Sequence, residues 1–118
     1  MSASSAGLYD DARFAGRLIV SLGQHFDHLD DVPEDLLARF MSDVSRASRT
    51  LRLVLSVDRV NVAVLGNQES HVHAHLIPRR RTDADPTTAP WQDPRPRQRL
   101  ASHEHSELVA LLRSVVPW

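Results

Sequence analysis

The sequence predicts an α+β fold, in which an antiparallel β-sheet carries a long packed helix and a second helix ends the chain. Three observations support this prediction. A short apolar strand comes first, a long run of helical periodicity follows, and two further strands then lie close enough in sequence to pair. This order of elements is typical of α+β domains. At 118 residues the chain is expected to form a single domain over residues 1–118, with one modest core.

The first half of the chain is expected to hold one strand and the long helix. Residues 1–7 are small and polar and are interpreted as a loose N-terminal tail, and residues 17–22 form the first apolar strand. Pro33 and Glu34 mark the start of a helix over residues 34–53. Its apolar face comprises Leu37, Phe40, Met41, Val44, Ala47 and Leu51. Its polar face comprises Glu34, Asp35, Arg39, Asp43 and Arg46.

The second half is expected to hold two paired strands, a loop and the last helix. Residues 59–65 and 71–77 form strands that are joined by a turn centred on Gly66. Residues 79–100 carry four prolines and scattered charges, which predicts an irregular loop rich in proline and arginine. A C-terminal amphipathic helix is predicted over residues 103–116, because its leucines and valines recur on one face.

The composition argues against several classes of protein. The net charge is −1 at pH 7, whereas a general nucleic-acid binder would carry a basic stripe. Cysteine is absent, so disulfides and thiolate zinc sites are excluded. No apolar run approaches the roughly 20 residues of a membrane span, and the N-terminal residues lack the features of a signal peptide. We therefore expect a cytoplasmic protein with no nucleic-acid partner and no membrane partner.

The most informative segment alternates three histidines with small apolar residues. His71, His73 and His75 are separated by Val72 and Ala74. In a β-strand this period of two places all three imidazoles on one face, with neighbouring residues of that face roughly 7 Å apart. A row of titratable rings on a strand that is packed from behind indicates a functional site.

Two kinds of chemistry suit such a row. A neutral imidazole can ligate a metal, and it can also attack an electrophilic centre and later leave. A metal site needs another ligand, but the first acid after the histidines is Asp83, beyond Arg79–Arg81. Amide and hydroxyl donors precede the histidines at Asn67, Gln68 and Ser70, and the arginines follow them. These surroundings favour a phosphate group, and no metal is expected.

With these residues the chain resembles the histidine triad (HIT) family, whose signature is His-φ-His-φ-His-φ-φ with φ an apolar residue. Residues 71–77 match this pattern at every position. Residues 60–67 resemble the strand and turn that precede the triad in short bacterial members. Residues 16–20, together with His25, resemble an early strand and turn of the family. The resemblance covers about residues 8–95, which is most of the chain.

The resemblance implies a nucleotide hydrolase or transferase that acts at an α-phosphorus and forms a nucleotidyl-histidine intermediate. His73 is implied to be the nucleophile, His71 to orient it, and His75 to bind the α-phosphate oxygens and assist the leaving group. The implied substrates are dinucleoside polyphosphates, nucleoside phosphoramidates or nucleotide sugars, and no cofactor is implied. The family also implies a homodimer whose sheets join side by side, for which the helix over residues 34–53 carries enough apolar surface.

Further binding residues follow from the resemblance and from two departures from it. Asn67, with Gln68 or Ser70, is implied to hold a phosphate or the leaving group. Many members carry a histidine directly after the early glycine, whereas this chain has Arg17, which either replaces that phosphate contact or indicates a changed substrate. The N-terminal region that usually encloses the nucleoside is short here, so Asp11 or the aspartate before it is the candidate for the ribose hydroxyls.

Other interpretations of these residues remain open. The short N-terminus and Arg17 favour a nucleotide-binding or regulatory module with little or no catalysis, whereas the intact triad favours an enzyme. A histidine-ligated metal protein is a third alternative. His25 is either a solvated turn residue or part of the site, and His28 is interpreted as a turn residue. Trp91 either packs in the long loop or covers a base or a partner subunit.

Overall fold

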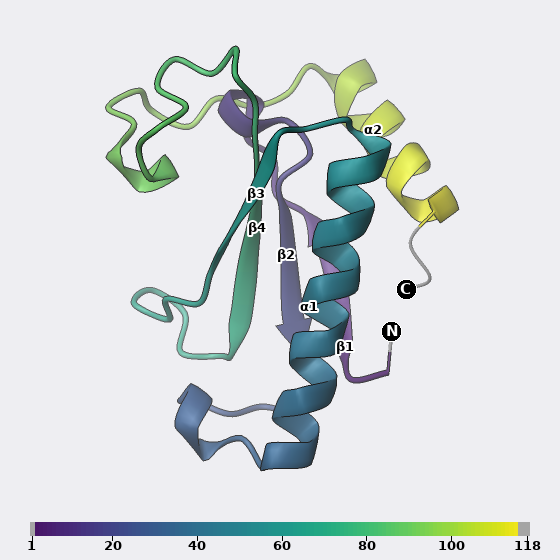
Figure 1. The fold of residues 1–118 in the computed structure, drawn as a ribbon, viewed down its shortest axis with the longest axis vertical. Coiled ribbons are helices and arrows are strands. Elements are labelled where there is room, and N and C mark those ends of the chain that lie inside the picture. The colour runs from purple at the N-terminus through teal and green to yellow at the C-terminus, as the bar shows by residue number, and fades with distance from the viewer. Residues whose placement is uncertain (1, 116–118) are drawn as a thin grey trace.

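The structure is a computed structural model that describes residues 2–115. Its four strands form one antiparallel sheet in the order β1-β2-β4-β3, as predicted for this fold class. The strands are β1 (Ser4–Leu8), β2 (Leu18–Leu22), β3 (Arg59–Ala63) and β4 (His73–Arg79). The long helix α1 (Glu34–Val54) crosses one face of the sheet, and α2 (Ser102–Val115) lies beside it (Figure 1). The α+β prediction is therefore confirmed.

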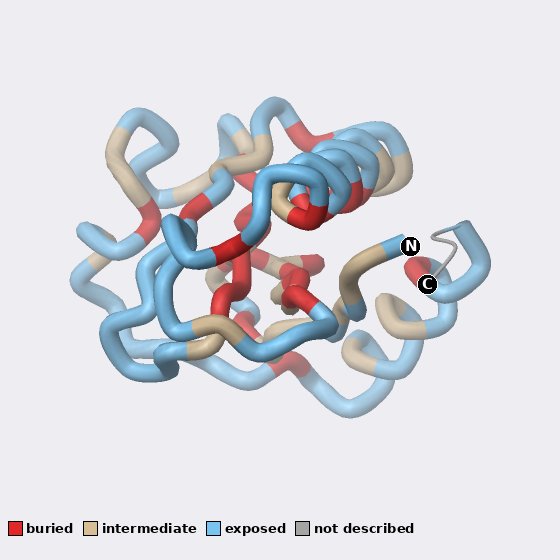
Figure 2. The backbone as a smooth tube through the Cα atoms, turned by 90° about the horizontal axis from the view of Figure 1, so that it is seen from below, coloured by how far each residue is buried: buried red, intermediate tan, exposed pale blue. Residues whose placement is uncertain are grey.

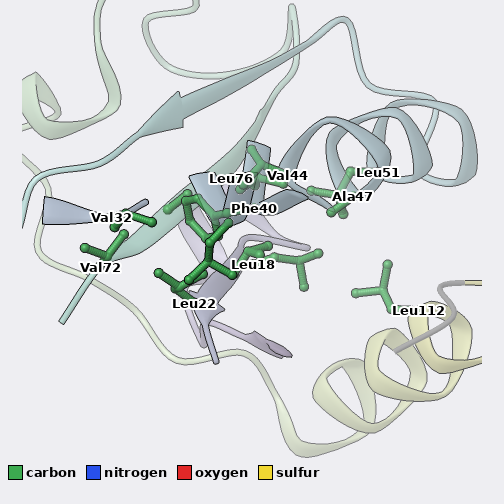
Figure 3. Close-up of a cluster of buried hydrophobic side chains, with 13 residues drawn as sticks. Leu18, Leu22, Val32, Phe40, Val44, Ala47, Leu51, Val72, Leu76 and Leu112 are labelled. Carbon is green, nitrogen blue, oxygen red and sulfur yellow. The ribbon is translucent and has the colours of Figure 1, made fainter. Parts of the chain in front are cut away.

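The hydrophobic core fills the space between α1 and the sheet. Alternate residues of β2 and β4 point toward the helix, and the buried residues of α1 recur three and four positions apart (Figure 3). The core comprises Leu18, Val20, Leu22, Val32, Leu36, Phe40, Val44, Ala47, Leu51, Val72, Ala74, Leu76 and Leu112. Figure 2 shows the buried positions gathered between the long helix and the sheet. The opposite face of the sheet is left for other residues of β4, including His73 and His75.

The prediction of a loose tail over residues 1–7 is wrong for residues 4–7, and position 1 lies outside the described residues. Ser4–Leu8 forms strand β1, which pairs with β2 from Ser4 opposite Leu22 to Leu8 opposite Leu18. Small serine, alanine and glycine side chains carry little strand propensity, so the strand depends on its partner rather than on its own sequence. No helix within residues 2–115 is long and apolar enough to cross a membrane.

The side chain of Asp43 on α1 holds the start of β1, and its position differs from the prediction. We placed Asp43 on the polar face of the helix, but its side chain is buried. Its carboxylate accepts hydrogen bonds from the backbone N–H of Ser2 at 3.3 Å, the N–H of Ala3 at 3.0 Å and the hydroxyl of Ser4 at 2.8 Å. The buried charge is therefore satisfied by the start of β1.

Two strand boundaries differ from the predictions in a way that matters for the site. β3 ends at Ala63 rather than at residue 65, and β4 begins at His73 rather than at residue 71. Before β4, the N–H of Val72 donates to the carbonyl of Phe26, outside the sheet register. His71 therefore precedes the strand as the structure defines it.

The loop over residues 80–100 is irregular, as predicted, and Arg79 organises its first part. The Arg79 guanidinium is buried and donates to Asp83, to Asn61 and to the carbonyls of Asp85 and Thr88. Arg80 donates to the Ala15 carbonyl, and Arg81 pairs with Asp58. The three arginines thus make these contacts at the entry to the loop. The final helix begins at Ser102, and position 116 lies outside the described residues.

Candidate active site

The alternation of β4 carries two histidines to the face of the sheet that lies away from the helices. Ala74 and Leu76 are fully buried in the core. His73 and His75 flank Ala74 in the strand, so their side chains point to the other face of the sheet. The ring centroids of His73 and His75 lie 5.1 Å apart, with the ring planes at 66°. These two rings therefore lean together and form an edge-to-face pair.

The position of the proton on His73 follows from its hydrogen-bond partner. Nδ1 of His73 lies 2.6 Å from the backbone carbonyl oxygen of His71. A carbonyl oxygen only accepts, so Nδ1 carries the proton and donates it. Nε2 then holds the lone pair of the neutral ring, and no hydrogen-bond partner for Nε2 is found within residues 2–115. The His73 side chain is thus prepared as a nucleophile or as a ligand.

His71 makes its contacts outside the strand. Its Nε2 donates to the carbonyl of Leu22 at 2.7 Å, which leaves Nδ1 as an acceptor. Nδ1 of His25 lies 3.1 Å from that acceptor, and the two rings stack with centroids 5.2 Å apart. Nε2 of His25 lies 3.0 Å from Asp27. Both partners of His25 are acceptors, so the doubly protonated ring satisfies both contacts and a neutral ring satisfies one. His25 therefore contacts the triad through His71, while its own side chain remains 69% exposed.

Arg17 holds the third histidine. Its Nη2 donates to Nδ1 of His75 at 3.0 Å, and its guanidinium carbon lies 4.1 Å from the centroid of the Tyr9 ring. Tyr9 also packs its ring edge-on against His75, at 5.8 Å between centroids. Burial, then the Arg17 charge and the neighbouring His73, lower the pKa of His75 to about 4.

A glycine brings Arg17 to this place. Gly16 has a φ of +99°, a backbone conformation that other residues rarely adopt, and a Cβ at this position would collide with the side chain of Leu55. Glycine thus allows the chain to turn tightly into β2, with Arg17 directly before the strand.

Asp11 lies beneath the site rather than on its surface. The carboxylate is fully buried, and its oxygens accept from the backbone and side chain of Arg13 and from Nη1 of Arg17 at 3.3 Å. The preceding Asp10 accepts from the backbone N–H of Leu100. The structure therefore does not place Asp11 where a ribose would reach it, and it gives this residue the role of fixing two arginines. No sequence signal had indicated this pairing.

A cleft of about 240 Å³ opens beside His75. Its lining combines two arginines, two aromatic rings and apolar residues: Tyr9, Arg13, Arg17, Ala63, Leu65, His75, Ile77, Pro90 and Trp91. Trp91 is 63% exposed, at the short turn Pro90–Gln92 in the long loop. Trp91 thus lies in the cleft lining, and no pattern in the sequence indicates Tyr9 or Arg13, because residues 9, 17, 75 and 91 meet only in the folded chain.

The remaining predicted residues lie on the exposed connection between β3 and β4. Asn67, Gln68 and Ser70 are all exposed, and the structure shows no hydrogen bond from their side chains to the triad. This connection runs from Ala63 at the end of β3 to His73 at the start of β4 (Figure 1). Asn67, Gln68 and Ser70 therefore come shortly before β4 in the sequence. Among the residues that the structure describes, no group of three or more histidine or carboxylate side chains is arranged to hold a metal ion.

Comparison with known proteins identifies the same fold and the same motif. A family model of the HIT domain matches residues 4–82. An uncharacterised HIT-like protein of Methanocaldococcus jannaschii is 31% identical over 78 residues, and the match covers 62% of this chain and 60% of that protein.

Solved structures give a fuller overlap than the sequence relative does. A histidine triad protein of Bradyrhizobium japonicum superposes with a TM-score of 0.89 and 26% identity, covering 100% of this chain and 87% of that one. A hypothetical histidine triad nucleotide-binding protein of Sulfolobus tokodaii shares the fold, with a TM-score of 0.76 and 21% identity over 97% of this chain and 78% of that one. The family match covers more than half of the sequence and includes all three triad histidines. The chain therefore belongs to the HIT domain family.

Proposed function

We propose that this protein is a nucleotide hydrolase or transferase that acts at the α-phosphorus of a small nucleotide through a covalent nucleotidyl-histidine. The observation that carries the proposal is the hydrogen bond from Nδ1 of His73 to the carbonyl of His71, which leaves the Nε2 lone pair free. A residue that only bound phosphate would donate a hydrogen bond, whereas this ring offers a nucleophile toward phosphorus. Family membership supports a nucleotide as the substrate.

The proposed reaction has two steps. The lone pair on Nε2 of His73 attacks the α-phosphorus, a phosphorus–nitrogen bond forms, and the leaving group departs with the electrons of its bond to phosphorus. Water or another acceptor then attacks the same phosphorus, and the electron pair returns to Nε2. The carbonyl of His71 accepts the hydrogen bond from Nδ1–H throughout, the proton stays on Nδ1, and this contact stabilises the positive charge of the nucleotidyl-imidazole.

The other residues have supporting roles in this proposal. Nε2–H of His75 donates to an oxygen of the α-phosphate, and Arg17 adds positive charge beside it. Asn67, with Gln68 or Ser70, closes over the phosphate from the connection between β3 and β4. Asp11 acts indirectly, because it holds Arg13 and Arg17 in place. No cofactor or metal takes part in the proposed chemistry.

We also propose that two copies of the chain pair along β3, the outer strand next to β4. An edge strand presents unpaired backbone groups, and this one ends in a run of exposed apolar residues. Val62 is 45% exposed, Leu65 is 55% exposed, and Met41 on α1 is 43% exposed. A second copy would complete the backbone hydrogen bonds of the edge strand and cover this apolar strip.

The proposed function is tested by turnover of diadenosine tetraphosphate and of adenosine phosphoramidate. The wild-type protein is compared with His73→Ala and with the matched control His103→Ala, which alters an exposed histidine on α2. We expect turnover that survives EDTA, falls at least about a thousand-fold in His73→Ala and is unchanged in His103→Ala. Product nucleotides are separated by chromatography.

Each other result contradicts the proposal in a specific way. Turnover retained by His73→Ala would exclude a nucleotidyl-His73 intermediate. Loss of turnover with EDTA would support a histidine-ligated metal. Tight nucleotide binding without turnover of either compound would favour a binding or regulatory module.

A further inference from the structure

The hydrogen bond from Arg17 determines which nitrogen of His75 carries the proton. Guanidinium groups donate hydrogen bonds and have no acceptor. Since Arg17 Nη2 lies 3.0 Å from Nδ1 of His75, that nitrogen must be the acceptor and must carry no proton. His75 is then the neutral tautomer with its proton on Nε2. A neutral imidazole N–H donates a hydrogen bond, but it does not give up its proton near neutral pH.

Arg17 is fixed firmly enough to make this tautomer permanent. Its Nη1 donates to the buried Asp11, its planar group stacks on Tyr9, and its Nε is buried without a hydrogen-bond partner. The side chain is only 14% exposed. Protonation of His75 at Nδ1 would place a second positive charge against this guanidinium. Burial of the ring, and after it the Arg17 charge, lower the pKa of His75 to about 4.

We propose, on the basis of the nucleotidyl transfer through His73, that Arg17 positions His75 as a permanently neutral donor and thereby restricts the enzyme to leaving groups that depart as anions without a proton. This property selects phosphoanhydrides, in which the α-phosphorus is joined through oxygen to a second phosphate. It disfavours phosphoramidates, because an amine leaves phosphorus only after it has been protonated.

The bonds and charges balance without an acid in this step. Nε2 of His73 forms the bond to phosphorus while the bond to the bridging oxygen breaks. The electron pair stays on that oxygen, and the leaving phosphate or polyphosphate departs with one more negative charge. His75 Nε2–H stabilises the equatorial phosphate oxygen and keeps its own proton. In the second step the proton of the attacking water passes to solvent.

The cleft beside His75 suits such an anion. Two guanidinium groups, those of Arg13 and Arg17, line it, and the buried carboxylate of Asp11 is the one acidic group hydrogen-bonded to them within residues 2–115. The described lining of the cleft therefore contains two cationic side chains and no acidic one. A polyphosphate gains from this charge, whereas an ammonium leaving group is repelled by it.

The protonation state is tested directly by nitrogen NMR. Long-range ¹⁵N–¹H spectra of the uniformly labelled wild-type protein distinguish the two neutral tautomers and the imidazolium form of each histidine. We expect His75 to show the Nε2–H tautomer without change from about pH 5 to about pH 8. In Arg17→Met the ring should titrate within this range. An imidazolium at His75 in the wild-type protein near pH 6.5 would overturn the proposal without any assay of activity.

The selectivity is tested with three substrates that share an adenylyl group. Diadenosine tetraphosphate has a polyphosphate leaving group, adenosine phosphoramidate has an amine, and the p-nitrophenyl ester of AMP has a leaving group that needs no proton. We expect kcat/KM of the wild-type protein for the anhydride to exceed that for the phosphoramidate at least about a hundred-fold. Arg17→Met should reduce this ratio at least about tenfold. Arg97→Met, which also removes an arginine stacked on Tyr9, should leave the ratio unchanged.

The outcomes separate this proposal from the proposed function. Turnover of the p-nitrophenyl ester that depends on His73, together with equal turnover of the anhydride and the phosphoramidate, would leave nucleotidyl transfer in place and overturn the role of Arg17. A ratio that is unchanged in Arg17→Met would also overturn it. Failure of all three substrates would refute the proposed function and this inference with it.

Discussion

Single groups that can only accept or only donate determine the tautomers of all three triad histidines. The carbonyl oxygens of His71 and Leu22 accept, so His73 is protonated on Nδ1 and His71 on Nε2. Arg17 donates, so His75 is protonated on Nε2. His71 and His75 therefore share one tautomer, with Nδ1 free of a proton, and His73 has the other. His73 alone offers an unpaired Nε2 lone pair at the triad.

The low pKa of His75 predicts a pH dependence of stability. The ring has a pKa of about 4 when folded and an ordinary value of 6.5. Between these values the unfolded chain binds a proton that the folded chain does not, so the free energy of unfolding falls as the pH drops from 6.5 toward 4. The shift corresponds to at most about 3 kcal/mol. Screening at the partly exposed ring reduces the expected loss to about 1–2 kcal/mol.

Urea denaturation at several pH values checks this expectation. In Arg17→Met the pKa of His75 should rise toward its ordinary value, so the loss of stability between neutral and acidic pH should become smaller. Arg97→Met serves as the control and should follow the wild-type curve. An equally steep curve for Arg17→Met would show that other groups are responsible for the acid sensitivity.

His25 predicts an effect on catalysis rather than on binding. It stacks on His71 and hydrogen-bonds to it, and the carbonyl of His71 in turn holds His73. We expect His25→Ala to lower kcat for diadenosine tetraphosphate about tenfold with little change in KM. The reason is that His25 would orient the reacting histidine through a hydrogen bond and would not contact the substrate. His28→Ala is the matched control, because His28 is an exposed neighbour on the same turn. Equal kcat values for the two variants would contradict the role of His25.

Among the elements of secondary structure, β1 depends most on contacts outside its own sequence. It joins the sheet only through β2, and its start is held by one carboxylate on α1. Helix α1 was predictable from the sequence because the apolar residues of an amphipathic helix recur three and four positions apart. The same periodicity predicts that Asp43 lies on the exposed polar face, and this prediction is wrong. The Asp43 carboxylate is buried because three donors near the start of β1 contact it, and such tertiary contacts do not appear in the periodicity.

Asp43→Ala is therefore expected to destabilise the protein more than an ordinary surface substitution. Removing the carboxylate leaves three donors near the start of β1 without their acceptor, and we expect a loss of about 2–3 kcal/mol in the free energy of unfolding. The measurement is chemical denaturation, compared with Asp35→Ala on the exposed face of the same helix. A loss that is no larger than that of Asp35→Ala would mean that the sheet alone holds β1.

At the scale of the whole molecule, the fold leaves two surfaces uncovered. One face of the sheet carries the triad and the cleft, and the outer edge of β3 carries exposed apolar residues. The helices occupy the other face (Figure 1). The proposed chemistry and the proposed self-association therefore use adjoining parts of one sheet, because Leu65 belongs both to the cleft and to the exposed apolar strip.

The proposed dimer is tested by Val62→Lys. A lysine on the exposed edge strand would place two like charges near each other across the proposed interface. By light scattering coupled to gel filtration we therefore expect Val62→Lys to be a monomer and the wild-type protein to be a dimer. Leu111→Lys changes an exposed leucine of α2 instead and should remain a dimer. A monomeric wild-type protein, or a dimeric Val62→Lys variant, would refute pairing along β3.

The sequence by itself determined the fold class, the long helix, the triad and the family, because each of these is written in local periodicity or in a contiguous motif. It also indicated that His73 and His75 share one face, since alternation along a strand is a local property. The prediction of an N-terminal tail, which relied on low strand propensity, was wrong because Ser4–Leu8 forms β1. The predicted end of β3 and the predicted start of β4 were each two residues away from the observed ones.

Only the tertiary structure decided which groups touch the triad. Arg17 and His75 are 58 residues apart in the sequence, and Ala3 and Asp43 are 40 apart. The sequence predicts Asp11 as a ligand for the ribose hydroxyls, but in the structure its side chain is buried and pairs with Arg13 and Arg17. Proton positions, buried charges and cleft linings depend on partners that the chain brings together from separate elements. No local pattern encodes such partners, because the free energy of each contact arises only when both groups have been placed by the fold.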